Sequence, residues 1–241
     1  MKRKLRPCLS LGLILTGGFT RVERSVAASP GQGSLTITLQ VYNYAEVDHK
    51  TLMGAEKVAA MIFRKAGVES RWVEAALNSD NKKGNSEDTE WLNLFPVAIL
   101  PSSMAERLPL ADNALGWAPG AGPDRHLVYV LYNRVESLAR EQTRAQVKGS
   151  IRAHAGAAQI LGTAIVHEIG HLLLNLESHS PIGIMRGGWD LNDLRSISYG
   201  SLFFTSQQAE VIRAEVGRRL SFSRRTRSGG VPKLPLRIFR D

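Results

Sequence analysis

The residues most suited to metal binding and catalysis are two histidines four positions apart, His167 and His171. Glu168 directly follows the first of them. On a helix, side chains four residues apart lie on the same face, with Cβ atoms about 5–6 Å apart. Two imidazoles at this spacing can each place a ring nitrogen about 2.0–2.1 Å from one Zn²⁺ ion. Glu168 would then lie beside the metal, where it can take a proton from a zinc-bound water. The motif therefore predicts a zinc site with an adjacent general base.

A catalytic zinc site needs a third protein ligand and one open position for water. Downstream of the motif, the candidates are His179 and three acidic residues, Glu177, Asp190 and Asp193. A helix that simply continued past the motif would carry the chain away from the metal, so the chain has to turn back. Asn175 favours such a turn, because asparagine is often found in the left-handed position that ends a helix. We expect His179 to be the third ligand, with Glu177 as the main alternative.

The elements that must position these residues are predicted from the spacing of apolar residues. Alternating apolar residues predict strands, and apolar residues three and four apart predict helices. A helix is expected over residues 49–66, ended by Gly67 in the left-handed position that glycine favours. Strands are expected over residues 35–42, 68–73, 94–100, 114–118 and 127–132.

A long helix over residues 140–174 is expected to carry the motif, with Gly149 and Gly156 as points where it can break. A last helix is expected over residues 205–219, where Thr205 is a suitable N-cap. The inward-facing residues predicted for this helix are Ala209, Val211, Ile212 and Val216. This order of elements favours one α+β domain, with a small twisted mixed β-sheet packed on the helix that carries the motif.

The net charge of +9 comes from the two ends of the chain. Residues 1–24 contain six Lys/Arg and one Glu, and residues 218–241 contain eight Lys/Arg and one Asp. The remaining residues, 25–217, therefore carry a net charge of −3. A slightly acidic body does not form a basic groove, so no nucleic-acid partner is expected.

The first 28 residues have the layout of a secretory signal peptide. Basic residues precede an apolar run over residues 9–19, and small residues over 25–29 offer a cleavage site. The apolar run is shorter than the roughly 20 residues that a membrane span needs, so no stable span is expected. We therefore expect a secreted or periplasmic protein, with a catalytic domain over residues 29–217 and a basic, flexible tail over residues 218–241. Its single cysteine, Cys8, would leave with the signal peptide.

The motif and the residues around it resemble those of the metzincin zinc peptidases, among them the matrixin-like and archaemetzincin-like members. The resemblance rests on residues 167–171, on His179, and on Gly183-Ile184-Met185 in the place of the family's Met-turn. Upstream, residues 114–120 followed by His126 are similar to the edge strand and bulge that precede the family's active-site helix. The similarity extends over roughly residues 35–190, and only the short motifs in it are specific.

The spacing of the third histidine departs from the family pattern. The family places a glycine at the third residue beyond the second ligand and the third ligand at the sixth, where this chain has Leu174 and Glu177. His179 comes two residues later, yet Met185 follows at a family-like distance from His167. An expansion of two residues before His179, offset by a shorter run to Met185, reconciles the two patterns.

The resemblance implies a zincin-like (metzincin-like) fold and a secreted zinc-dependent metalloendopeptidase. It implies that Zn²⁺ is bound by His167, His171 and His179, that Glu168 is the general base, and that Met185 forms an apolar floor beneath the ligands. An extended peptide or protein substrate would pair with Leu115, Gly116 and Trp117. Two alternatives remain open: an exported zinc-binding protein without peptidase activity, or a zinc hydrolase of non-peptide amides.

Overall fold

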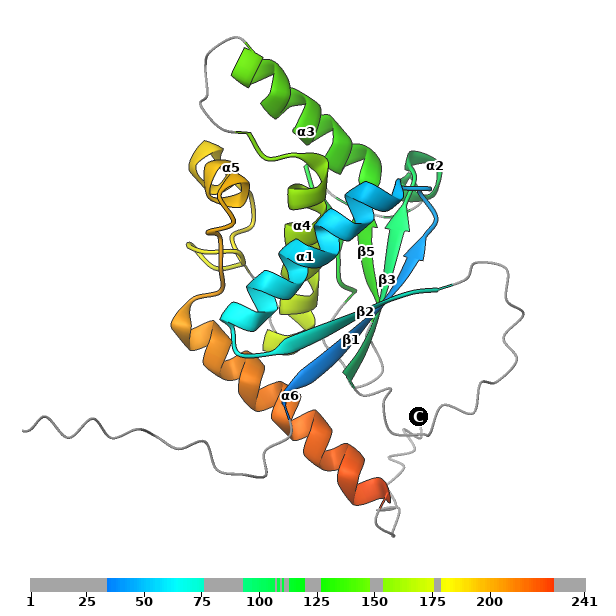
Figure 1. The fold of residues 1–241 in the computed structure, drawn as a ribbon, viewed down its shortest axis with the longest axis vertical. Coiled ribbons are helices and arrows are strands. Elements are labelled where there is room, and N and C mark those ends of the chain that lie inside the picture. Colours follow the sequence, from blue (N-terminus) through cyan, green and yellow to red (C-terminus); the bar gives the residue numbers. More distant parts are fainter. Residues whose placement is uncertain are drawn as a thin grey trace, which may run out of the picture. The chain divides into compact units, whose positions relative to one another are not determined.

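Figure 1 shows the fold in the computed structural model, which describes residues 34–75, 93–106, 108, 110, 113–119, 127–147, 154–175 and 179–227. The expected signal peptide lies outside these ranges, as do His126, Gly149, Glu177 and the chain beyond Arg227. Within the described ranges, five strands form one sheet in the order β2-β1-β3-β5-β4. The protein is therefore a mixed α/β protein built on a mostly parallel sheet.

The strands follow the predicted segments closely. Alternation in the first strand is confirmed, since Ile37, Leu39 and Val41 are fully buried. The edge strand pairs antiparallel with its neighbour, whereas the other pairs are parallel. It is only two residues long, shorter than predicted. The strands are β1 (Thr36–Asn43), β2 (Glu69–Glu74), β3 (Leu94–Leu100), β4 (Gly116–Trp117) and β5 (Val128–Leu131).

Helices occupy the connections and the C-terminal half of the chain. In the first of them, the side chain of Asp48 caps the N-terminus by accepting a hydrogen bond from the Thr51 backbone N–H. Gly67 follows the helix with φ +83°, as the sequence predicted. The helices are α1 (His49–Lys65), α2 (Ser102–Ala105), α3 (Tyr132–Val147), α4 (Ala157–Leu174), α5 (Leu191–Ser198) and α6 (Ser206–Arg227).

The helix predicted over residues 140–174 is interrupted, as the sequence allowed at Gly156, and two helices share this stretch. α3 begins directly after β5 and ends at Val147, and α4 begins after Gly156. Gly156 has extended backbone dihedrals (φ −80°, ψ 168°), and its N–H donates a 2.9 Å hydrogen bond to the side chain of Gln159. Gly156 is therefore the N-cap of a new helix, which confirms it as a break point, whereas Gly149 lies outside the described residues.

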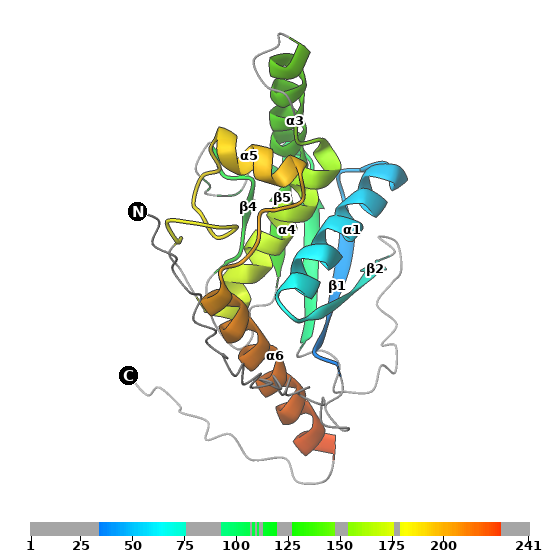
Figure 2. The same cartoon turned by 60° about the vertical axis from the view of Figure 1, so that its left-hand side comes forward.

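α4 is the central helix of the core. Figure 2 shows α1 and α4 side by side, and their backbones approach closely where glycines face the partner helix. A Cβ atom at Gly162 would lie 2.5 Å from the Ala55 carbonyl oxygen, and one at Gly54 would lie 2.7 Å from Ala158 Cβ. These two glycines therefore set the distance between the helices.

Among the helices in the described ranges, α4 alone has the length and apolar composition of a membrane span. However, 78% of this segment is buried inside the protein. A buried core helix has the same composition, which agrees with the central position of α4.

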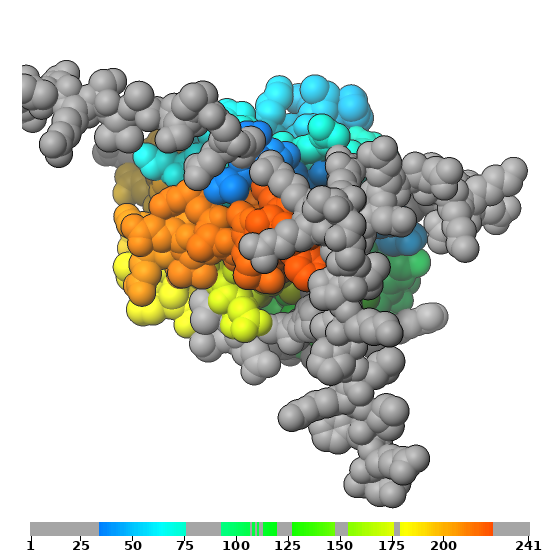
Figure 3. Space-filling model, turned by 90° about the horizontal axis from the view of Figure 1, so that it is seen from below, coloured from blue at the N-terminus to red at the C-terminus, as the bar shows by residue number. Residues whose placement is uncertain are grey.

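α6 is longer than predicted and covers one end of the sheet. The sequence predicted its end at Arg219, but the helix continues to Arg227 and so includes the start of the expected tail. Ala209, Ile212 and Val216 are buried as predicted, whereas Val211 is 44% exposed and that part of the prediction is wrong. Figure 3 shows α6 across one face with residues of β1 beside it. The Arg219 guanidinium lies 5.2 Å from the centre of the Phe95 ring, which ties α6 to β3.

The close approach of α1 and α4 makes a testable prediction for two helical glycines. Gly162→Ala should lower the free energy of unfolding by about 1–3 kcal/mol, because its Cβ would overlap the Ala55 carbonyl. Gly217→Ala in α6 is the matched control, since its Cβ would make an ordinary 3.6 Å contact with Leu35. That change should instead stabilise the protein by about 0.5–1 kcal/mol through helix propensity. Urea unfolding of both variants measures the difference, and equal effects would contradict this account of the packing.

Candidate metal centre

The first two histidines of the centre are held by the rigid, buried part of α4. Ile165, Val166 and Ile169 around them are fully buried, and His167 and Glu168 are each only 7% exposed. His171 is half-buried and lies one helical turn further along the same face. The sequence places polar side chains on an apolar helix, and the surrounding core then fixes their direction.

A turn after α4 sends the chain back toward the histidines. Asn175 has left-handed dihedrals (φ 52°, ψ 43°), and its N–H donates to the carbonyl of His171, as the sequence predicted. The returning segment is then anchored at both ends. The N–H of Ser180 donates to Met185 O at 2.8 Å, and the N–H of Ile184 donates to Phe203 O at 3.0 Å. This loop presents His179 to the helix.

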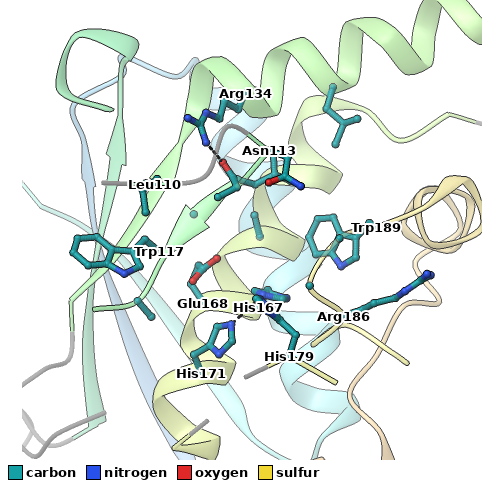
Figure 4. A pocket seen from close by; sticks show the side chains of 18 of the residues that line it. Leu110, Asn113, Trp117, Arg134, His167, Glu168, His171, His179, Arg186 and Trp189 are labelled. Carbon is teal, nitrogen blue, oxygen red and sulfur yellow. Dashed lines mark hydrogen bonds between the residues drawn. The ribbon is translucent and has the colours of Figure 1, made fainter. Parts of the chain in front are cut away.

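The structure brings His167, His171 and His179 together, as Figure 4 shows. One ring nitrogen from each lies within 4.8 Å of the other two, and the Nε2 atoms of His167 and His171 are 3.2 Å apart. Nitrogen ligands about 2.0–2.1 Å from a tetrahedral metal ion are separated by about 3.3–3.4 Å. The first two imidazoles therefore already have the spacing of metal ligands. The cluster could hold a metal ion, and the exposed His179 would supply the third ligand from the loop.

The orientation of His167 is set by its second nitrogen. Nδ1 donates a hydrogen bond of 2.6 Å to the carbonyl oxygen of Ile184, which leaves Nε2 directed at His171. The same carbonyl accepts a 3.3 Å hydrogen bond from Nε1 of Trp189. The pKa of His167 is lowered from 6.5 to about 4, mainly by burial; the nearby imidazoles act in the same direction, and the Ile184 hydrogen bond acts in the opposite one. The ring is therefore neutral at pH 7, as a metal ligand must be.

Glu168 is held between α4 and the edge strand β4. Its carboxylate accepts a hydrogen bond from the backbone of Ala118, and it packs against Gly116. A Cβ atom at Gly116 would lie 2.7 Å from Glu168 Cγ and 2.7 Å from the Tyr129 carbonyl oxygen. Burial raises the pKa of Glu168 from 4.5 to about 8, although the Ala118 hydrogen bond acts in the opposite direction. The site thus contains a carboxyl group whose ionisation depends on its surroundings.

Met185 packs against α4 at Gly170 and is fully buried. Gly170 makes this contact possible, because a Cβ there would lie 2.5 Å from the Met185 sulfur atom. Gly183 turns the preceding loop with φ +74°. The contact places Met185 next to the residue that precedes His171, and its role as an apolar floor stays a prediction.

The histidines and Glu168 line a cavity of about 860 Å³. Leu115, Gly116 and Trp117 of the expected substrate strand lie along its wall, and Trp189 lies on the side of the triad. Trp117 stacks on Tyr129 of β5, with ring centres 5.7 Å apart. A cavity with polar groups gathered at one point and apolar walls is typical of sites that bind small molecules or peptide segments.

Asp190 and Asp193 are not metal ligands in this arrangement. Both carboxylates pair with Nη1 of Arg186, at 2.6 and 2.7 Å. Asp190 also caps the N-terminus of α5 by accepting hydrogen bonds from the backbone of Asn192 and Asp193. These acids therefore stabilise the start of α5. Glu177, the other alternative to His179, lies outside the described residues.

Sequence reasoning missed the residue that makes room for His179. A Cβ atom at Gly187 would lie 2.7 Å from Cγ and 2.8 Å from Nδ1 of the His179 imidazole. Gln208 of α6 also supports the loop, since its Nε2 donates to the Ser180 hydroxyl at 3.2 Å. The Gly187-Gly188 pair after Met185 was the available sequence feature, but its role depends on a contact across the loop.

A comparison with protein-family models and with curated proteins finds no match to this chain. The function is therefore inferred from the geometry and residue types of the site.

The contact between Gly187 and His179 predicts a selective effect on metal binding. Gly187→Ala should displace the imidazole of His179 and weaken metal affinity by about tenfold or more, the usual range for residues that orient a ligand. Gly188→Ala is the matched control, because a Cβ there would have no neighbour within 4 Å. Competition titration with a chromogenic chelator measures both affinities. An unchanged affinity in the Gly187 variant would show that His179 does not bind the metal.

The raised pKa of Glu168 predicts a pH-dependent stability difference in the metal-free protein. Below pH 4.5 the carboxyl is neutral in both folded and unfolded states, and its burial has no ionisation cost. As the pH rises toward about 8, the unfolded state ionises first and the folded state loses stability. Glu168→Gln should therefore be more stable than the parent at pH 8 and nearly equal to it at pH 4.5. Thermal unfolding across this range tests it, and a difference that shrinks with rising pH would contradict it.

Proposed function

We propose that this chain is an exported zinc-dependent metalloendopeptidase of the metzincin type. The observation that carries the proposal is the position of Glu168. It is buried beside a triad of histidines and directly against the edge strand of the sheet, in one cavity. A histidine triad alone would suit a structural metal site. A buried carboxylate facing both the triad and a strand edge suits the hydrolysis of an extended chain.

The donor set favours zinc. Three imidazoles suit a borderline-soft ion, and three protein ligands leave a fourth position open, as catalytic zinc sites require. His167, His171 and His179 would hold the ion. In such a site zinc supplies Lewis acidity to the scissile carbonyl and lowers the pKa of water to about 7.

Glu168 would act as the general base and then as the general acid. A divalent cation beside it would favour its ionised form and so offset the effect of burial. The carboxylate takes a proton from the attacking water as the water oxygen bonds to the carbonyl carbon. It then gives that proton to the amine nitrogen as the C–N bond breaks. The hydrogen bond from Ala118 holds one side of the carboxyl group during both transfers.

The edge strand β4 would bind the substrate. The N–H of Leu131 donates to Leu115 O at 2.8 Å, so the backbone of Leu115 faces β5. Successive residues in an antiparallel pair face alternately toward and away from the partner strand. The N–H and C=O of Gly116 therefore face the open edge, where an extended peptide can add as a further strand.

Other features support the family assignment within this proposal. The sheet ends in a short antiparallel edge strand beside the helix that carries the motif, and Met185 packs against that helix at Gly170. These are the features expected of a zincin-like domain. Export rests on the N-terminal residues, which lie outside the described ranges.

Glu168→Gln separates a peptidase from a metal-binding protein without activity. The amide keeps the shape of the side chain but cannot accept the proton, so hydrolysis should fall by about 10²-fold or more. Zinc content and folding should remain those of the parent. Cleavage of a peptide library by the zinc-loaded proteins, with zinc measured by mass spectrometry, provides the test. Equal cleavage by both proteins would rule out Glu168 as the base, and cleavage of no peptide by the parent would rule out the peptidase.

A further inference from the structure

Arg134 links α3 to the segment that leads into the edge strand. Its Nη1 donates a 2.7 Å hydrogen bond to the carbonyl oxygen of Ala114, and both residues line the cavity. Figure 4 shows the guanidinium above the histidines, on the same side of the cavity as Asn113. Hydrogen bonds from charged donors are roughly twice as strong as neutral ones. This contact therefore holds the segment before β4 firmly against α3.

The backbone groups on either side of Gly116 are already engaged along the open edge. The Ala114 carbonyl accepts from Arg134, and the backbone of Ala118 donates to Glu168. Between them, Gly116 directs its N–H and C=O outward, because the neighbouring Leu115 carbonyl faces β5. A peptide that adds to an edge pairs with every second residue of the strand. Among the described outward positions, Ala114 has its carbonyl and Ala118 its N–H already engaged, so an antiparallel peptide can exchange both hydrogen bonds of a pair only with Gly116.

We infer that Arg134 fixes the edge strand and sets how much of its backbone a peptide substrate can use. By occupying the Ala114 carbonyl, it takes up the acceptor that the N–H of a longer peptide would otherwise use beyond Gly116. A longer peptide then forms one backbone hydrogen bond fewer with the edge. This inference rests on the proposed function, because it assigns an extended peptide to the cavity. Arg134 is a specificity-determining residue in this account and takes no part in the chemical step.

Peptide length is the variable that tests the inference. Zinc-loaded Glu168→Gln protein binds peptides without cleaving them, and its amide oxygen still accepts from Ala118. Capped peptides of alternating alanine and serine, of increasing length, probe backbone pairing with little contribution from side chains. Calorimetry should show that affinity rises less with length once a peptide extends past Gly116 to Ala114. In the Glu168→Gln protein that also carries Arg134→Met, longer peptides should bind roughly threefold to tenfold more tightly than they bind Glu168→Gln alone. This is the usual contribution of one hydrogen bond to affinity.

Arg144→Met is the matched control. Arg144 lies on the same helix, is exposed and does not line the cavity, so its change should leave the length dependence as in the parent. A uniform loss of affinity at every length in Arg134→Met would indicate a merely structural role and would overturn the inference. An unchanged length dependence in that variant would overturn it as well.

Hydrogen exchange separates this inference from the proposed function. If no peptide binds to any variant, the proposed function fails, and exchange at the Leu131 amide then decides the role of Arg134. That amide donates to the Leu115 carbonyl, next to the residue that Arg134 holds. In Arg134→Met, the Leu131 amide should exchange faster, while the amides that pair β1 with β3 should exchange as in the parent. This result would support the inference that Arg134 fixes the edge strand. Unchanged exchange at Leu131 would refute it.

Discussion

The hydrogen bond from Nδ1 of His167 to the carbonyl oxygen of Ile184 joins the two parts of the site. One part is the rigid core helix α4, and the other is the returning loop that carries His179. An unpaired donor in this buried position would be costly, so the bond restricts both the ring and the loop. It also leaves Nε2 of His167 facing His171. The common direction of the histidines therefore depends on a backbone carbonyl seventeen residues away in the chain.

Glycines give the functional side chains their places around this bond. The missing Cβ atom of Gly170 leaves space for Met185 against the helix. In the same way, Gly187 leaves space for His179 and Gly116 leaves space for Glu168. At each of these positions a Cβ atom would approach its neighbour to 2.5–2.7 Å. A close-packed interior transmits such an overlap to its surroundings and does not absorb it. The geometry of the site is thus set as much by absent side chains as by the histidines themselves.

The sequence predicted helices, strands and turns well where they depend on residues close together in the chain. Alternation at Ile37, Leu39 and Val41 and the turn at Asn175 are local features, and the structure agrees with them. The helix expected over residues 140–174 breaks at Gly156, where the sequence allowed a break, but its first part begins earlier than predicted, at Tyr132. The sequence motif indicated His167, Glu168 and His171, and the turn indicated His179. The roles of Gly187, Arg134 and the Ile184 carbonyl could not be predicted, because each depends on contacts between segments that are distant in the chain.

The central claim is that three imidazoles, and no carboxylate, hold one zinc ion. Anomalous diffraction at the zinc absorption edge from crystals of the zinc-loaded protein tests it directly. The account predicts a single peak about 2.0–2.1 Å from a ring nitrogen of each of His167, His171 and His179. A peak coordinated by Glu177 in place of His179, or no peak beside His167 and His171, would contradict it.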